Sequence, residues 1–170
     1  LWTAEVTPLI DYWVTAGDSP ADILESYTAV TGRAPMLPGF ASGFWQSKLR
    51  YRTQEELLTV AREYKRRGLP LSMIVIDNFH TPHHGEWRFD PDCWPDPQAM
   101  VDELRELGVE LMVSIWPTVD AYSSHYETMK RKGYLVHTER GVRTQLICCG
   151  NELFFDATHP GARGYVWEQA

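Results

Sequence analysis

Residues 71–77 read Leu71-Ser72-Met73-Ile74-Val75-Ile76-Asp77, an apolar run that ends in a carboxylate. A strand that is apolar on both faces is typical of a parallel sheet covered by helices. Two further apolar segments, 40–45 and 109–116, flank this run, and a helix pattern fills each interval between them. The alternation of strands and helices predicts an α/β fold built on a parallel sheet.

Capping residues mark where the helices begin and end. Thr53 and Glu56 form a capping box, and Gly68 with Pro70 ends the helix that they open. The other expected elements are a helix at 97–107, a helix at about 124–132, a β-hairpin at 134–149 that turns at Glu139-Arg140-Gly141, an extended segment at 153–156 and a helix that opens at Pro160.

The first 37 residues have a different pattern. The apolar run 8–14 predicts a strand, and residues 19–32 predict a helix with Ser19 as its N-cap. Residues 33–39 hold two prolines and a glycine, Pro35, Pro38 and Gly39, which indicates irregular chain and a domain boundary. We therefore divide the chain into residues 1–37 and 38–170.

Composition excludes some classes of protein. The chain has 170 residues, is 44% hydrophobic and carries a net charge of -7, which is typical of a globular domain and argues against a nucleic-acid partner. No apolar run approaches the roughly 20 residues needed to cross a bilayer, so no membrane partner is expected. The chain begins at Leu1 rather than Met, so we expect a fragment; its location stays unassigned, with the cytoplasm favoured.

Two kinds of side chain bear on function. The three cysteines, Cys93, Cys148 and Cys149, are an odd set with an adjacent pair, and we interpret all three as free thiols. Seven Trp and eight Tyr offer flat apolar faces with polar edges, which suit sugar stacking, cores and protein interfaces alike.

Two architectures fit the strand and helix order: a doubly wound sheet and a (β/α)₈ barrel. No Gly-rich turn follows any strand, which disfavours a nucleotide-binding domain. A barrel needs about 200 residues or more, and only three βα units are visible here. If the fold is a barrel, the chain holds an incomplete one.

Ligands of both architectures bind beyond the carboxyl ends of the strands. Segments 45–48, 77–80 and 116–120 would lie there. Asp77 follows a dry strand, so its carboxylate is suited either to two sugar hydroxyls or to loop amides. Trp116 is suited either to a stacking wall or to packing above the sheet.

A long loop, 78–95, follows the central strand, and loops of this length are often functional. Its Trp87 and Trp94 would pin the loop or line a pocket. Its histidines, His80, His83 and His84, lack a nearby fourth ligand, so we predict no metal site. A pair of glycosidase carboxylates could come from four acidic residues, but the spacing does not single out two of them. These four are Asp77, Glu86, Asp90 and Asp120.

The chain resembles glycoside hydrolase family 31 in a series of ordered motifs. They are Gly43-Phe44-Trp45-Gln46-Ser47-Lys48-Leu49-Arg50-Tyr51, Arg67-Gly68-Leu69-Pro70-Leu71 with Ile74-Val75-Ile76-Asp77, Phe89-Asp90-Pro91 with Trp94-Pro95-Asp96-Pro97, Met112-Val113-Ser114-Ile115-Trp116-Pro117, and Phe155-Asp156-Ala157-Thr158. Each motif is modest alone, but their order and spacing together are specific.

The resemblance implies about the first three βα units of a (β/α)₈ TIM barrel at 38–170. Residues 1–37 would be the end of an N-terminal β-sandwich and a linker helix. The family is retaining, with an Asp nucleophile and an Asp acid/base, and both are expected beyond Ala170. The substrate-binding residues implied are Asp77, Asn78, Ile115 and Trp116, with no metal and no organic cofactor.

The resemblance implies that the chain is a fragment of a retaining α-glycosidase, an enzyme that removes terminal α-linked xylose or glucose from oligosaccharides. Segment 45–48 favours xylose. The alternative is a catalytically inactive carbohydrate-binding protein on the same barrel, and an unrelated α/β binding module is disfavoured by the ordered motifs. A homo-oligomer of the full-length protein stays open.

Overall fold

The structure is a computed structural model that describes residues 9–78, 80–138, 140–141, 145–146 and 151–170. The chain divides into two compact units, Leu1–Leu37 and Pro38–Ala170, which are described separately. Within the described residues, no helix is long and apolar enough to cross a membrane.

The first unit contains the predicted helix. Helix α1 spans Pro20–Thr31, and the Ser19 hydroxyl accepts a hydrogen bond from the backbone N–H of Asp22 at 3.2 Å. Gly32 ends the helix with a φ of 101°, a conformation that favours glycine. The strand predicted at 8–14 is wrong over its described part, because an apolar run becomes a strand only within a hydrogen-bonded ladder and neither described sheet includes it.

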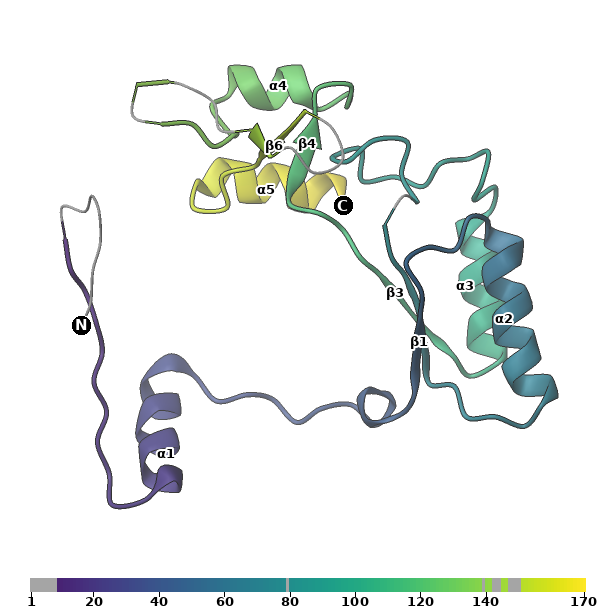
Figure 1. The fold of residues 1–170 in the computed structure, drawn as a ribbon, viewed down its shortest axis with the longest axis horizontal. Coiled ribbons are helices and arrows are strands. Elements are labelled where there is room, and N and C mark those ends of the chain that lie inside the picture. The colour runs from purple at the N-terminus through teal and green to yellow at the C-terminus, as the bar shows by residue number, and fades with distance from the viewer. Residues whose placement is uncertain (1–8, 79, 139, 142–144, 147–150) are drawn as a thin grey trace. The chain divides into compact units, whose positions relative to one another are not determined.

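The second unit is built on the predicted parallel sheet (Figure 1). Its strand order is β1-β2-β3, with Met73 of β2 opposite Trp45 on one side and Glu110 on the other. The elements are β1 (Trp45–Ser47), α2 (Gln54–Arg66), β2 (Met73–Ile76), α3 (Pro97–Glu106) and β3 (Glu110–Val113). Helices α2 and α3 lie side by side against one face of this sheet, so the α/β prediction is confirmed.

The core of this layer lies between the sheet and the two helices. Ile74 and Ile76 of β2 are fully buried, as are Leu57 of α2 and Met100 of α3. Burial of each such side chain contributes about 1.5–3 kcal/mol. Trp94 of the long loop is 1% exposed and belongs to the same core, so it pins the loop.

The two outer strands differ from the prediction. Residues Gly39–Ser42 form a short 3₁₀ helix, so β1 begins only at Trp45, and Phe44 and Trp45 are more than one-third exposed. Strand β3 is regular only over Glu110–Val113, and Met112 is 44% exposed. Both strands were predicted to be buried, but each lies at an edge of a three-stranded sheet, where its side chains have neighbours on one side only.

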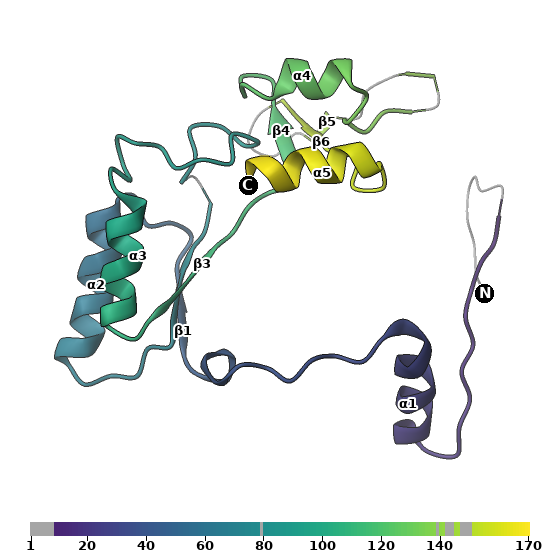
Figure 2. The same ribbon diagram turned by 180° about the vertical axis from the view of Figure 1, so that it is seen from behind.

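A second, antiparallel sheet follows β3, with strand order β4-β6-β5 (Figure 2). Its strands and helices are β4 (Thr118–Asp120), α4 (Tyr126–Arg131), β5 (Gln145–Leu146), β6 (Glu152–Phe154) and α5 (Pro160–Gln169). A separate core of Val119, Met129, Leu135, Leu153 and Val166 joins this sheet to α4 and α5. The predicted helices at 124–132 and from Pro160, and the extended segment at 153–156, are confirmed with small shifts of their ends.

The hairpin predicted at 134–149 is wrong over its described residues. Leu135 bridges to Phe155, and β5 pairs with β6. The described residues of both arms therefore pair with the segment 152–155 and not with each other. Strand β6 lies at the centre of the second sheet, so its backbone groups are hydrogen-bonded on two sides. Cys93 is a free thiol, whereas Cys148 and Cys149 lie outside the described residues.

Candidate functional site

The long loop after β2 is hydrogen-bonded to helix α2 and to the second sheet. On the side of α2, the N–H of Gln54 donates to the carbonyl of Cys93 at 3.0 Å, and within the loop the N–H of Asp90 donates to the carbonyl of His80 at 2.9 Å. On the other side, the N–H of Asp120 in β4 donates to the carbonyl of His84 at 2.9 Å. The loop therefore spans the gap between the carboxyl ends of β2 and β3 and the second sheet.

The segment around Gly85 is tightly constrained. Gly85 has a φ of 84°, and a Cβ placed there would lie 2.9 Å from the Cα of Val119. The Ser123 hydroxyl donates to the Gly85 carbonyl at 3.0 Å. Trp87 also has a positive φ, 49°, which costs energy for a bulky residue and often marks a functional segment.

Asp77 lies at the carboxyl end of β2, as its position in the sequence predicts. Its carboxylate is partly buried, and Oδ1 accepts the N–H of Asn78 at 2.8 Å. No hydrogen bond to Oδ2 is found within the described part of the chain. Of the two roles left open by the sequence, the structure shows the bond to a loop amide, and the binding of sugar hydroxyls stays a prediction.

Asn78 and Trp116 are joined by a residue that we did not predict for the site. The side chain of Asn78 is buried, and its Oδ1 lies 2.7 Å from Nε2 of His84. The same imidazole stacks on the Trp116 indole, with ring centroids 5.1 Å apart and planes 17° apart. The side-chain amide of Asn78 therefore points inward toward His84, and the Trp116 ring packs against the His84 ring.

The third partner of His84 is Glu152 of β6. Nδ1 of His84 lies 2.7 Å from Oε1 of Glu152, and the two side chains are only 9% and 2% exposed. The two residues are 68 positions apart, and the sequence did not predict which strands pair with the segment that holds Glu152. Nothing in the sequence marks the pair, beyond an acidic residue placed in an apolar strand.

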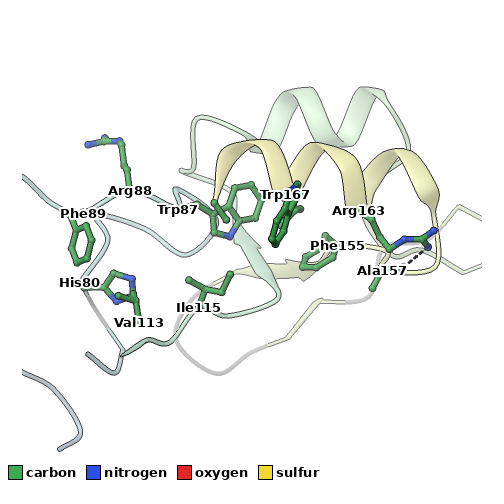
Figure 3. A pocket seen from close by; sticks show the side chains of 12 residues that line it. His80, Trp87, Arg88, Phe89, Val113, Ile115, Phe155, Ala157, Arg163 and Trp167 are labelled. Atoms are coloured by element: carbon green, nitrogen blue, oxygen red, sulfur yellow. Dashed lines mark hydrogen bonds between the residues drawn. The ribbon is translucent and has the colours of Figure 1, made fainter. Parts of the chain in front are cut away.

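An open cavity of about 740 Å³ lies between β3, the loop and α5 (Figure 3). Its wall is mostly apolar, and the larger residues include Trp87, Phe89, Ile115, Phe155, Val166 and Trp167. His80 lines it too; burial lowers the pKa of its imidazole, with the Asp77 carbonyl 3.3 Å from Nδ1 acting in the opposite direction. Ile115 is half exposed here. Trp87 both lines the cavity and packs against the second core.

Glu86 is a second buried carboxylate of the loop. Its oxygens accept the N–H of Ser124 at 2.9 Å and the Ser124 hydroxyl at 3.0 Å, and Arg88 lies 3.4 Å away. Burial raises the pKa of Glu86, but the Ser124 hydrogen bonds and the Arg88 charge outweigh it and leave the pKa below its usual value. The Glu86 side chain thus links the loop to Ser124, just before α4.

Metal binding by the loop histidines stays a negative prediction. In the part of the chain that the structure describes, no three His, Cys, Asp or Glu side chains converge as a metal would require. His84 is bonded to Asn78 and Glu152, and His83 lies 5.9 Å from the Tyr122 ring.

Comparison with known proteins identifies the family. Residues 34–170 match the model of the glycosyl hydrolases family 31 TIM-barrel domain. The chain is 58% identical over 167 residues to an uncharacterized family 31 glucosidase of Pseudescherichia vulneris, and 38% identical over 171 residues to alpha-xylosidase A of Aspergillus niger. The chain belongs to glycoside hydrolase family 31. Its second unit, which has an α/β fold, lies within the region that matches the family's TIM-barrel domain.

Solved structures agree. The crystal structure of a family 31 alpha-xylosidase from a soil metagenome, complexed with xylose, matches 92% of this chain with a TM-score of 0.87 and 65% identity. The chain covers 23% of that protein. The matches to the Pseudescherichia and Aspergillus proteins each include 98% of this chain. They include only 32% of the Pseudescherichia protein and 23% of the Aspergillus protein.

Proposed function

We propose that this chain is the N-terminal part of the catalytic barrel of a retaining α-glycosidase that removes terminal α-linked xylose or glucose from oligosaccharides. The relatives support the class of enzyme, since those with the higher identities include proteins named as α-xylosidases. Residues 1–37 would be the end of a preceding β-sandwich with a linker helix, and residues 38–170 about the first three βα units of the barrel. The match of the family model to 34–170 supports this division.

The single observation that carries the proposal is the setting of Asp77. Its carboxylate follows the buried central strand at the edge where barrels bind ligands, and among the described residues only its Oδ1 accepts a hydrogen bond, from Asn78. A carboxylate oxygen accepts a sugar hydroxyl in a charge-assisted hydrogen bond. Ile115 and Trp116 follow the neighbouring strand and offer the apolar and aromatic surfaces that a sugar ring packs on.

The catalytic pair is proposed to lie beyond Ala170. Glycosidases need two carboxylates about 5 to 9.5 Å apart across the sugar, with one able to hold a proton. Among the loop carboxylates, Glu86 has both oxygens bonded by Ser124, so it is a poor candidate for either role. The exposed side chains of β3 and the apolar cavity beside α5 would be covered by the remaining units of the barrel. No metal or organic cofactor is proposed.

We favour xylose over glucose because the structure with 65% identity is an α-xylosidase. The test is kcat/KM of the full-length protein on aryl α-xyloside and aryl α-glucoside. A larger value for the xyloside is expected. Absence of turnover on both, with retained binding of xylose, would instead support a carbohydrate-binding protein on the same barrel.

A further inference from the structure

One imidazole contacts Asn78, Glu152 and Trp116 at the proposed sugar site. His84 lies 2.7 Å from Asn78 through Nε2, 2.7 Å from Glu152 through Nδ1, and flat against Trp116. Two of these neighbours, Asn78 and Trp116, are proposed substrate-binding residues, while Glu152 belongs to the second sheet. The contacts therefore join the site to a strand far along the chain.

Burial of the Glu152 carboxylate beside His84 is energetically unfavourable. Its side chain is 2% exposed, and within the described residues its Oε2 has no hydrogen-bond partner. Burial of a carboxylate carries a large desolvation penalty, and a buried pair of this kind is often no more stabilising than apolar side chains of similar volume. Fold stability alone is therefore a weak reason for Glu152 to stand in β6.

The geometry points to a positioning role instead. We infer that Glu152 and His84 form a positioning pair that fixes the side chain of Asn78 and the ring plane of Trp116. Hydrogen bonds at both ring nitrogens oppose rotation of the imidazole, and the Trp116 indole lies 17° from the imidazole plane. The inference rests on the proposed function, because it names residues that prepare the same sugar site.

The constraint also extends to Asp77. Asn78 is held by its side chain to His84 and donates its backbone N–H to Oδ1 of Asp77. A shift of the His84 ring would move Asn78 and, through it, the carboxylate that is proposed to accept sugar hydroxyls. Misplacement of a site by about 1 Å can cost roughly a hundredfold in rate.

The first experiment replaces the pair by apolar groups in the full-length protein, as His84→Phe with Glu152→Leu. The new ring keeps its stacking on Trp116, and no buried charge is left unpaired, so the protein is expected to fold. Both hydrogen bonds are lost. We expect kcat/KM on aryl α-xyloside to fall at least tenfold, with parallel rises in KM and in the inhibition constant of xylose, because the sugar site is loosened for the ground state as well.

The matched control is Glu86→Gln. Glu86 is also a buried carboxylate of the same region, but its bonds go to Ser124 and not to Asn78 or Trp116. It is expected to lower the thermal unfolding midpoint while kcat/KM stays within threefold of the wild type. An equal loss of kcat/KM in Glu86→Gln would overturn the positioning role, as would a folded double variant with kcat/KM within threefold.

Two single changes separate length from charge and serve if the double variant does not fold. Glu152→Gln keeps the length and an oxygen that accepts from Nδ1 of His84, and a 180° rotation of the Asn78 amide lets its NH2 group donate to Nε2, so kcat/KM should stay within threefold. Glu152→Asp keeps the charge but draws the carboxylate back from His84, so a loss of tenfold or more is expected. The opposite order would refute the inference. If the wild type itself shows no turnover, the proposed function fails, and xylose affinities of the same variants, measured by calorimetry, decide the positioning role.

Discussion

Gly85→Ala tests whether the long loop is held against β4 as tightly as the structure shows. A Cβ at Gly85 would lie 2.9 Å from both Cα and Cγ1 of Val119, and Cα belongs to the backbone of a buried strand residue that cannot rotate away. The φ of 84° adds strain for any residue with a side chain.

The two effects can be sized separately. Left-handed backbone costs an alanine about 1–2 kcal/mol relative to glycine. Overpacking of a filled site costs about 1–3 kcal/mol more. Gly68→Ala is the matched control, because Gly68 has a φ of 66° and no heavy atom within 4 Å of the added Cβ. The difference between the two variants, about 1–3 kcal/mol, isolates the clash with Val119.

Hydrogen exchange of the full-length protein, followed by mass spectrometry, is the assay. The reporting amides are those of Asp120, which donates to the carbonyl of His84, and Ser124, which donates to Glu86. Since about 1.4 kcal/mol is a factor of ten in an opening equilibrium, their exchange should speed up roughly 5- to 140-fold more in Gly85→Ala than the amides beside residue 68 do in Gly68→Ala. Equal acceleration in the two variants would show that Val119 does not confine the loop.

Three further outcomes are expected. Asp77→Ala in the full-length protein should lower kcat/KM on aryl α-xyloside by about 3 kcal/mol, or roughly a hundredfold, and unchanged kinetics would remove Asp77 from the site. Because the folded-state pKa of Glu86 is lowered, its contribution to stability is full above the ordinary value of 4.5 and is lost as pH falls through the lower folded value. Ser124→Ala should move that loss to higher pH in a series of thermal unfolding midpoints. Residues 1–170 expressed alone should show no α-xyloside or α-glucoside turnover, and turnover that is lost on Asp77→Ala would place the catalytic carboxylates within them.

Helices were predictable from short-range signals. Ser19, Thr53 and Asp96 each accept a backbone N–H within the first turn of the helix that follows, as their residue types and spacing indicate. Such hydrogen bonds depend on three or four neighbouring residues, so the sequence carries the whole signal.

Burial and pairing were less predictable because they depend on residues far along the chain. Strands β1 and β3 have apolar sequences, but their side chains are buried only as far as neighbours exist beside them. Asp77 could be placed at a strand end from the run before it. The inward orientation of the Asn78 side chain could not be predicted, because it depends on the contact with His84. His84 in turn contacts Glu152, whose strand β6 pairs with β4 and β5.

The contact between His84 and Glu152 also sets an order of events during protein synthesis. At about 5–20 residues per second, the 68 residues between them take roughly 3 to 14 s to translate. Strand β2 and helix α2, whose contacts are local, can assemble within that time. The imidazole, however, has no carboxylate beside it until β6 has left the ribosome, so the proposed sugar site is completed well after the sheet beneath it.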